Sequence, residues 1–280
     1  MSQYEQISVT LKDRVTTIAL NRPDKLNAWT SQMAAELRRA IAAAGTTPEC
    51  RCIVITGTGR GFCAGADMAG LQDTASSGGA ARQRADVPVD VSFKGAPGPD
   101  LGEEYPGRFG YFYKCPVPII AAINGPCAGI GLIMTLYADL RYADESAKFT
   151  TAFAARGLIA EHGISWLLPR LVGEANALDL LLTSRKFSGA DAQSLGLVNQ
   201  ALSGASLMSH VESVARMLAY DVSPRSVAIM KRQVRAAYAQ SFAESLAVAD
   251  TQMAESFSTF DFAEGVNSYV ERRAPEFRGE

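Results

Sequence analysis

The sequence predicts an α/β fold followed by a helical C-terminal region. Over residues 1–203, short runs of β-branched and apolar residues alternate with helical patterns. From about Ala205 onward the composition is helical throughout, with a break at Ser223-Pro224. Strand–helix alternation that gives way to consecutive helices is typical of an α/β core with a helical tail. We therefore divide the chain into a core at 1–203 and a helical region at 204–280.

Length, charge and cysteine content limit the class of protein. A chain of 280 residues is near the size at which a single core stops growing, which favours one main domain with an appendage. Its net charge of −2 is spread along the chain, and Lys and Arg form no stripe with interleaved aromatic residues, so no nucleic-acid partner is expected. The N-terminus lacks a signal-peptide pattern, which favours a cytoplasmic protein. Five cysteines in mostly apolar contexts are expected to be reduced thiols.

The first predicted elements are two strands and a helix. Apolar residues alternate in 7–11 and 15–20, which predicts paired strands. Thr30 or Ser31 is a suitable N-cap for a helix that runs to about Ala44 and ends at Gly45. The polar turn at 21–28 is, from the residues alone, as consistent with a solvated loop as with a binding site.

A buried strand is predicted at 51–57, and a glycine-rich segment follows it. This segment lacks the last glycine of G-x-G-x-x-G and any Gly-Lys-Ser/Thr, so it is not a phosphate loop. Asp67 is placed to cap a short helix that ends near Asp73. The stretch 74–106 is rich in Gly, Ala, Pro and Ser and is expected to form a long loop or lid.

A second strand-to-helix junction lies within 115–140. No charged side chain occurs from Cys115 to Ala138, but prolines and an Asn-Gly-Pro turn divide the run into pieces too short to span a membrane. We predict a strand at 118–123 and a helix at 130–137. The first turn of a helix carries backbone N–H groups without intrahelical acceptors, and two such junctions can direct two donors at one ligand oxygen. Tight packing explains the glycines equally well.

The remaining elements complete the expected alternation. We predict a short helix over 109–114, where Phe109 and Phe112 either line a pocket or pack against the sheet. Further strands are expected at 139–143, 148–151 and 197–201, and further helices from about 164, at 174–182 and at 189–194.

Four segments together carry a resemblance to a known family. They are Asn21-Arg22-Pro23-Asp24-Lys25-Leu26-Asn27-Ala28, Gly61-Phe62-Cys63-Ala64-Gly65-Ala66-Asp67, Ile123-Asn124-Gly125-Pro126 through Gly131, and Leu195-Gly196-Leu197-Val198-Asn199. In this order they resemble the crotonase (enoyl-CoA hydratase/isomerase) superfamily, and the likeness covers nearly the whole chain, least clearly at 74–106. It implies a ClpP/crotonase-like spiral of ββα units and a homotrimer or dimer of trimers. It also implies an acyl-CoA or enoyl-CoA thioester as the partner, with coenzyme A carried by the substrate, no other cofactor and no metal.

The resemblance also implies roles for individual residues. The backbone N–H groups of Ala66 and Ile130 would form an oxyanion hole for a thioester carbonyl. The residues implied to border the coenzyme A site are Arg22, Lys25, Leu26, Ala28, Ala64, Ala66, Asp67 and Met68.

The sequence departs from the family pattern at its acids. Hydratases of the family use two glutamates, and the matching positions here are Ile133 and Phe153, which we expect in the pocket with Phe109 and Phe112. The remaining candidate acid is Glu161. Its segment, Gly157-Leu158-Ile159-Ala160-Glu161-His162-Gly163, looks like the Gly-Leu-x-x-Glu-x-Gly segment of peroxisomal-type Δ3,Δ2-enoyl-CoA isomerases. This likeness implies one carboxylate that moves a proton from C2 to C4; from the residues alone, Glu161 is equally a helix cap.

Three functions remain open at the level of the sequence: isomerisation by Glu161, hydration supported by Glu161 or by the lid acids Glu103 and Glu104, and acyl-CoA binding without turnover. His162 could act as a general base, but one of the two side chains Glu161 and His162 is expected to face away, because neighbouring side chains in an extended loop point apart. The chain has 2 histidines, so a Ser-His-Asp triad or a histidine-rich metal site is not expected.

Overall fold

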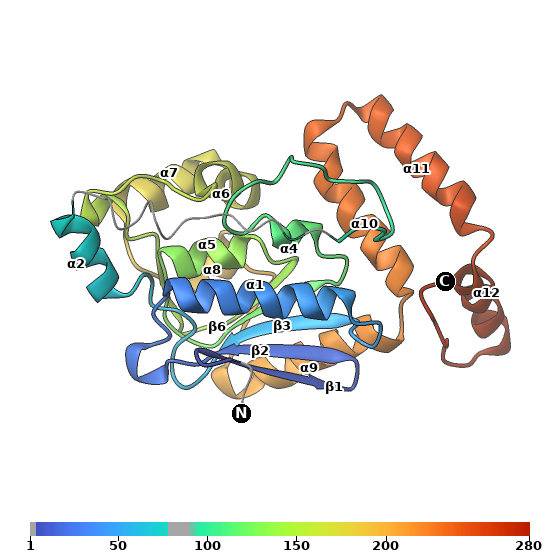
Figure 1. Ribbon diagram of the computed structural model, residues 1–280, viewed down its shortest axis with the longest axis horizontal. Helices are drawn as coiled ribbons and strands as arrows, with labels where there is room; N and C mark the ends of the chain where they lie inside the picture. The colour runs from blue at the N-terminus through green and yellow to red at the C-terminus, as the bar shows by residue number, and fades with distance from the viewer. Residues whose placement is uncertain (1–3, 78–90, 92) are drawn as a thin grey trace.

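The computed structural model describes residues 4–77, 91 and 93–280. The part of the expected lid at 78–90 and 92 lies outside the described residues. The described remainder of the chain confirms the α/β class, with strands, helices and a helical C-terminal region in the predicted order (Figure 1).

The main sheet has six strands in the order β1-β2-β3-β4-β6-β9. The first pair is antiparallel and all the other neighbours are parallel. The six strands are β1 (Ile7–Lys12), β2 (Val15–Leu20), β3 (Cys52–Gly57), β4 (Ile119–Ile123), β6 (Leu140–Asp144) and β9 (Gln200–Leu202). A smaller sheet, which the sequence patterns did not reveal, joins β5 (Cys127–Ala128), β7 (Lys148–Thr150) and β8 (Phe187–Ser188).

Both faces of the main sheet are buried. Side chains alternate along β3, so that Ile53 and Ile55 belong to one apolar cluster and Cys52 and Val54 to the other. Helix α1 (Ser31–Thr46) covers the first face and α9 (Gly204–Tyr220) the second. Helix α9 therefore completes the core, although it begins the region that we separated from the core at residue 204. A mainly parallel sheet needs helices on both faces, which explains the difference.

Local sequence explains how α1 is placed. The Thr30 side chain accepts a hydrogen bond from the Met33 N–H (3.0 Å), as expected of an N-cap. Gly45 does not end the helix, which continues to Thr46. A Cβ at position 45 would overlap the Phe93 ring, so close packing accounts for this glycine.

The other helices surround the sheet and extend beyond it. Those near the ends of the parallel strands are α2 (Met68–Ser76), α4 (Tyr111–Lys114), α5 (Ile130–Leu136), α6 (Ile164–Val172), α7 (Glu174–Thr183) and α8 (Gly189–Ser194), with the 3-10 turns η1 (Pro23–Lys25) and η2 (Ala154–Arg156). After α9 follow α10 (Pro224–Ala236), η3 (Ala237–Ala239), α11 (Phe242–Ser256) and α12 (Phe260–Glu271). Figure 1 shows α11 and α12 at the opposite end of the molecule from α2. None of the helices in the described part of the chain is both long and apolar enough to span a bilayer.

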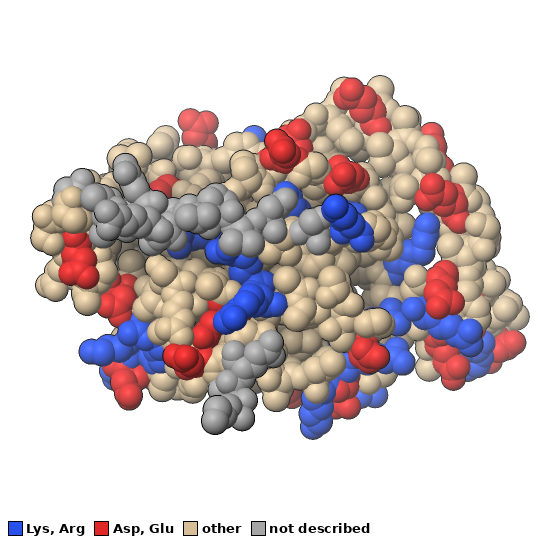
Figure 2. Space-filling view, viewed as in Figure 1, with Lys and Arg blue, Asp and Glu red and all other residues tan. Residues whose placement is uncertain are grey.

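Charged side chains are mixed over the face seen in Figure 2, where Lys and Arg alternate with Asp and Glu. This face carries no continuous basic surface of the kind that binds a phosphate backbone. The five cysteines are free and buried.

Candidate functional site

A cavity of about 870 Å³ lies where the two strand-to-helix junctions meet the loop after β7. It brings together most of the residues that the sequence singled out. The predicted site residues that line it are Arg22, Lys25, Ala28, Ala64, Ala66, Asp67, Met68, Ile130, Phe153 and Glu161.

The two junctions are held side by side by a backbone bridge. The Cys63 N–H donates to the Pro126 carbonyl (3.0 Å), and the Ala128 N–H donates to the Cys63 carbonyl (3.0 Å). Gly131 permits this approach, because a Cβ there would lie 2.7 Å from the Cβ of Cys63. Burial raises the pKa of the Cys63 thiol to about 12, so this cysteine is a packing residue and not a nucleophile.

The first junction turns the Ala66 N–H away from the neighbouring segment. Trp29 donates its N–H to the Gly65 carbonyl (2.8 Å) and accepts the Asp67 N–H (3.0 Å). Both hydrogen bonds use the residues on either side of Ala66, so the N–H of Ala66 itself points to the opposite side. Among the hydrogen bonds between described residues, none has this N–H as its donor. Gly65 adopts a φ of +107°, a conformation that favours glycine.

The second junction presents the Ile130 N–H at the start of α5. Ile130 is the first residue of this helix, where a backbone N–H has no intrahelical acceptor. The preceding Gly129 is fixed by its N–H, which donates to the Thr150 carbonyl (3.0 Å), and by its own carbonyl, which accepts the Ile133 N–H (3.0 Å). Ala66 and Ile130 thus line one cavity from two separate elements.

Arg22 and Asp67 form a charged pair in the cavity lining. One guanidinium nitrogen of Arg22 donates to the Ala28 carbonyl (2.6 Å) and to Oδ2 of Asp67 (2.8 Å). The hydrogen bond from Arg22 is the main cause that lowers the pKa of Asp67, whose Oδ1 also caps α2 through the Ala69 N–H (3.1 Å). Lys25 adds a second positive side chain to the cavity lining.

Leu26 supports this wall and does not line the cavity. Its backbone is left-handed, with a φ of +48°, and its carbonyl accepts the Ala64 N–H (3.0 Å). The residue therefore links the 21–28 turn to the first junction, and its expected place beside a ligand stays a prediction.

Three residues expected in the pocket are core residues outside the cavity lining. Ile133 is fully buried in α5, and Phe109 and Phe112 contact each other with ring centroids 5.9 Å apart. Phe109, which precedes α4, also packs on Tyr137, the C-cap of α5, with ring centroids 5.6 Å apart. Of the two alternatives for Phe109 and Phe112, the structure favours packing. Phe153, by contrast, lines the cavity as expected.

Glu161 and His162 both line the cavity, contrary to the expectation that one of them faces away. His162 adopts a φ of +51°, which turns the chain so that the two side chains lie on the same side. Nε2 of His162 is 3.7 Å from Oε1 of Glu161, and the side chains are 15% and 22% exposed. The capping alternative for Glu161 does not hold, because Gly163 is the N-cap of α6 and no side chain caps this helix.

Among the lining residues that were not predicted as site residues, Trp29 and Arg108 stand out by their chemistry. Trp29 is 5% exposed, and its indole N–H has no acceptor among the residues that the structure describes. Arg108 adds a cation to the lining. The position of Trp29, directly after the Asn27-Ala28 end of a motif, was a signal that pointed to it. Glu103 and Glu104, the lid acids, are exposed and are not part of the lining.

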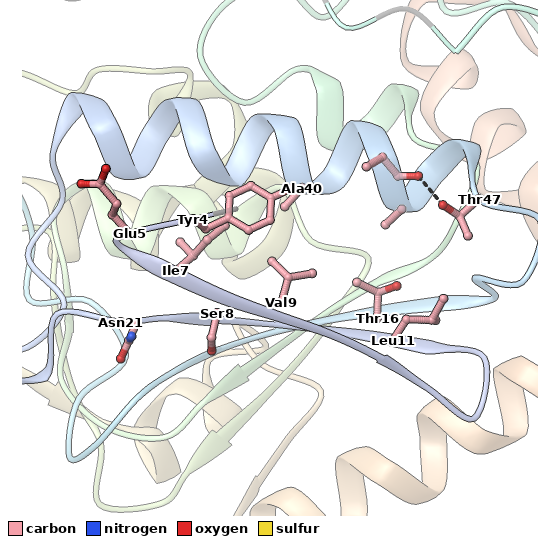
Figure 3. A pocket seen from close by; sticks show the side chains of 12 residues that line it. Tyr4, Glu5, Ile7, Ser8, Val9, Leu11, Thr16, Asn21, Ala40 and Thr47 are labelled. Carbon is pink, nitrogen blue, oxygen red and sulfur yellow. Dashed lines mark hydrogen bonds between the residues drawn. The ribbon is translucent and has the colours of Figure 1, made fainter. Parts of the chain in front are cut away.

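A second cavity of about 690 Å³ lies between α1 and β1. Figure 3 shows its side chains, which include Tyr4, Ile7, Val9 and Leu11. Apart from Glu5 it brings together no acid or base, so the chemistry is assigned to the first cavity. Within the described ranges, no group of three His, Cys, Asp or Glu side chains is arranged to hold a metal ion.

Comparison with known proteins gives one consistent result. The family model described as enoyl-CoA hydratase/isomerase matches residues 10–87 and 100–280. The chain is 32% identical to the 1,2-epoxyphenylacetyl-CoA isomerase of Escherichia coli (strain K12), over 95% of each chain. It is 33% identical to a probable enoyl-CoA hydratase of Rhodobacter capsulatus, over 99% of each. The crystal structure of a putative enoyl-CoA hydratase from Streptomyces coelicolor A3(2) matches with a TM-score of 0.86 and 29% identity, covering 100% of this chain and 96% of that one.

Proposed function

The chain belongs to the enoyl-CoA hydratase/isomerase family, the crotonase superfamily, and from this premise we propose that it moves the double bond of an enoyl-CoA thioester. The single observation that carries the proposal is the place of Glu161 in the cavity that Ala66 and Ile130 also line. A carboxylate near two convergent N–H donors is the arrangement that proton transfer next to a thioester requires.

The thioester carbonyl oxygen would accept hydrogen bonds from the N–H groups of Ala66 and Ile130. The side-by-side junctions, held through Cys63, support this role. When a proton leaves the carbon beside the carbonyl, negative charge moves onto that oxygen, and each donor is worth about 3 kcal/mol in the transition state. Arg22 and Lys25 would contact the coenzyme A part at the other end of the cavity.

Glu161 would act as both base and acid. Its carboxylate takes a proton from C2 of a 3-enoyl-CoA, the electrons delocalise over the dienolate, and the carboxylic acid returns the proton to C4. The product is a 2-enoyl-CoA, and Glu161 is regenerated as a carboxylate. No water is consumed, in keeping with Ile133 and Phe153 at the two positions where the family's hydratases have glutamates.

The other acids near the cavity are weaker candidates than Glu161 for the proton transfer. Among the described residues of the lining, the remaining carboxylates are Asp67 and Asp73. Asp67 is engaged by Arg22, and Asp73 lies on the exposed side of α2. Glu103 and Glu104 do not contribute to the described lining.

The test offers purified protein trans-3-hexenoyl-CoA and crotonyl-CoA and follows products by chromatography. We expect conversion of the 3-enoyl thioester to the 2-enoyl thioester, lost in Glu161→Gln and retained in Glu49→Gln, a matched change at an exposed glutamate outside the cavity. Full activity of Glu161→Gln would move the chemistry to another residue.

Hydration is the second candidate function, and the contact between Glu161 and His162 favours it, since a second titratable group beside the carboxylate can orient water. Formation of 3-hydroxybutyryl-CoA from crotonyl-CoA would support hydration. Saturable binding of both thioesters without turnover would identify a non-catalytic acyl-CoA-binding protein.

We also propose that the chain assembles through its C-terminal helices as a homotrimer or a dimer of trimers. Large apolar side chains are exposed on α11 and α12, among them Phe242 (84%), Tyr269 (85%) and Val270 (72%). Single exposed apolar residues are common, but this accumulation on adjacent helices is typical of a contact surface. Coenzyme A would arrive with the substrate, and proton transfer by Glu161 requires no further cofactor or metal.

A further inference from the structure

We propose that His162 is a positioning residue that acts through Glu161: its imidazole holds the carboxylate inside the cavity and forms an ion pair with it when the imidazole is protonated. The proposal rests on the role of Glu161 given above. It starts from the distance of 3.7 Å between Nε2 of His162 and Oε1 of Glu161, which adjacent residues of an extended chain do not reach with both side chains in one cavity.

The imidazole is held in place by the packing around it. The Tyr137 hydroxyl donates to the His162 carbonyl (2.9 Å), which fixes the backbone at its left-handed conformation. A Cβ at Gly163 would lie 2.8 Å from the same hydroxyl, so the following residue is also restricted. The Phe109 ring meets the imidazole edge to face, with centroids 6.3 Å apart.

The Phe109 contact gives a residue outside the cavity lining a part in the site. Phe109 packs between the rings of Trp29 and His162, with a Trp29–Phe109 centroid distance of 5.6 Å. Trp29 in turn holds the Ala66 segment through its backbone. One aromatic ring therefore links the wall that carries the proposed donor to the wall that carries the proposed base.

The charge of a protonated His162 gives this residue an electrostatic effect on Glu161 in addition to its packing. An imidazolium at 3.7 Å from a carboxylate attracts it strongly in a partly buried site, whereas the neutral ring does not. The other charged groups of the described lining are Arg108, Arg156, Lys25, Asp73 and the Arg22–Asp67 pair. On α5 and its cap, Tyr137 contributes only a hydroxyl, which is engaged by the His162 carbonyl.

The chemical consequence follows from what the carboxylate has to do. A carboxylate paired with an imidazolium is held in place but is a weaker base toward a carbon-bound proton. The same carboxylate beside a neutral imidazole keeps its basicity. We therefore expect turnover to rise as His162 loses its proton, in the range between about pH 5 and 8 where histidine titrates.

The first test needs no turnover. In ligand-free protein, NMR titration follows the imidazole Cε1–H signals of the 2 histidines, and His210→Gln assigns them. In Glu161→Gln, we expect the His162 midpoint to fall by about 1 pH unit, while that of His210, which packs on Tyr142 outside the cavity, stays unchanged. An unchanged His162 midpoint in Glu161→Gln would overturn the proposal whatever reaction the protein catalyses.

The second test separates orientation from charge by kinetics on trans-3-hexenoyl-CoA. His162→Ala removes both the orienting side chain and its charge, and it should lower kcat by about 10- to 100-fold with little change in KM. His162→Gln keeps a donor without a titratable charge, so it should recover much of kcat at high pH and flatten the pH dependence. His210→Gln should match the wild type. A His162→Gln profile with the wild-type pH dependence would contradict the ion pair, and absence of turnover in the wild type would contradict the proposed reaction only, since the NMR result stands by itself.

Discussion

Trp29 and Ala66 face each other across a parallel bridge in which Trp29 makes both hydrogen bonds and Ala66 makes neither. The N–H of Trp29 donates to the residue before Ala66, and its carbonyl accepts from the residue after it, at 2.8 and 3.0 Å. This relationship leaves the Ala66 N–H without a partner in the bridge, and both residues line the cavity. The same two residues come from segments that lie far apart in the sequence.

The indole N–H of Trp29 can be tested by Trp29→Phe. A buried donor without an acceptor costs about 1–3 kcal/mol, so its removal should leave the free energy of unfolding unchanged or slightly higher, while the ring contact with Phe109 is kept. Trp29→Ala should cost about 3–5 kcal/mol by loss of the ring. Urea unfolding measures the free energy of unfolding of both variants. A loss of more than about 2 kcal/mol in Trp29→Phe would mean that the indole N–H has an acceptor in the folded protein.

The Ile130 donor can be removed without deleting the helix. Proline is well tolerated at the first position of a helix, where its missing N–H breaks no intrahelical bond, and Ile130 holds that position in α5. Ile130→Pro should lower kcat/KM on a 3-enoyl-CoA by about 10²- to 10³-fold. Ile130→Val, which keeps the N–H, should stay within a few-fold of the wild type. Equal losses in the two variants would show that the side chain matters and the donor does not.

Close packing at Gly131 predicts a stability difference between two glycines. Gly131→Ala places a Cβ 2.7 Å from that of Cys63 and should cost about 1–3 kcal/mol. Gly70→Ala is the matched control, since nothing lies within 4 Å of its new Cβ on the exposed helix α2, and it should be neutral or stabilising by about 0.5–1 kcal/mol. Thermal unfolding of the two variants compares them directly, and equal melting temperatures would refute the close approach.

The Glu264–Arg273 pair predicts a pH dependence. Hydrogen bonds from Arg273 lower the pKa of Glu264 to about 2, and one of them joins Nη2 to Oε2 at 2.8 Å. A carboxyl whose folded pKa is depressed stabilises the fold fully above its ordinary value of 4.5, and this stability is lost as the pH falls through about 2. The melting temperature of Glu264→Gln should therefore lie below that of the wild type at pH 7, with the gap closing below pH 4.5. A gap that does not vary with pH would assign the effect to packing.

The apolar residues on α11 and α12 predict the assembly state. Light scattering after size exclusion should give a mass three or six times the 29.9 kDa of the chain. Phe242→Ser with Tyr269→Ser should shift the protein toward smaller species, because both side chains are more than four-fifths exposed in the isolated chain. Leu182→Ser, at an exposed leucine on α7, is the control and should leave the mass unchanged. A monomeric wild type would refute the proposed assembly.

Local sequence patterns were enough to predict the strands of the main sheet and most of the helices, and the resemblance to the crotonase superfamily implied much of the cavity wall. Alternating apolar residues identified β2, a continuous β-branched run identified β3, and the caps at Thr30 and Asp67 identified where α1 and α2 begin. These features depend on hydrogen bonds and periodicities within a few residues, which the sequence contains directly. The motifs also led to the two junctions whose residues Ala66 and Ile130 line the cavity.

Tertiary structure decided the features that depend on contacts between residues far apart in the sequence. Close packing against Phe93 explains the glycine at position 45. The ring contacts of Phe109 and Phe112 explain why these two side chains lie in the core. Helix α9 belongs to the core because the second face of the sheet has to be covered. His162 turns toward Glu161 through a left-handed backbone that Tyr137 holds from another helix. The sequence by itself determined which groups the chain carries and where its elements start; the packing of distant segments decided which of those groups meet, because side-chain direction is set by neighbours that no local pattern records.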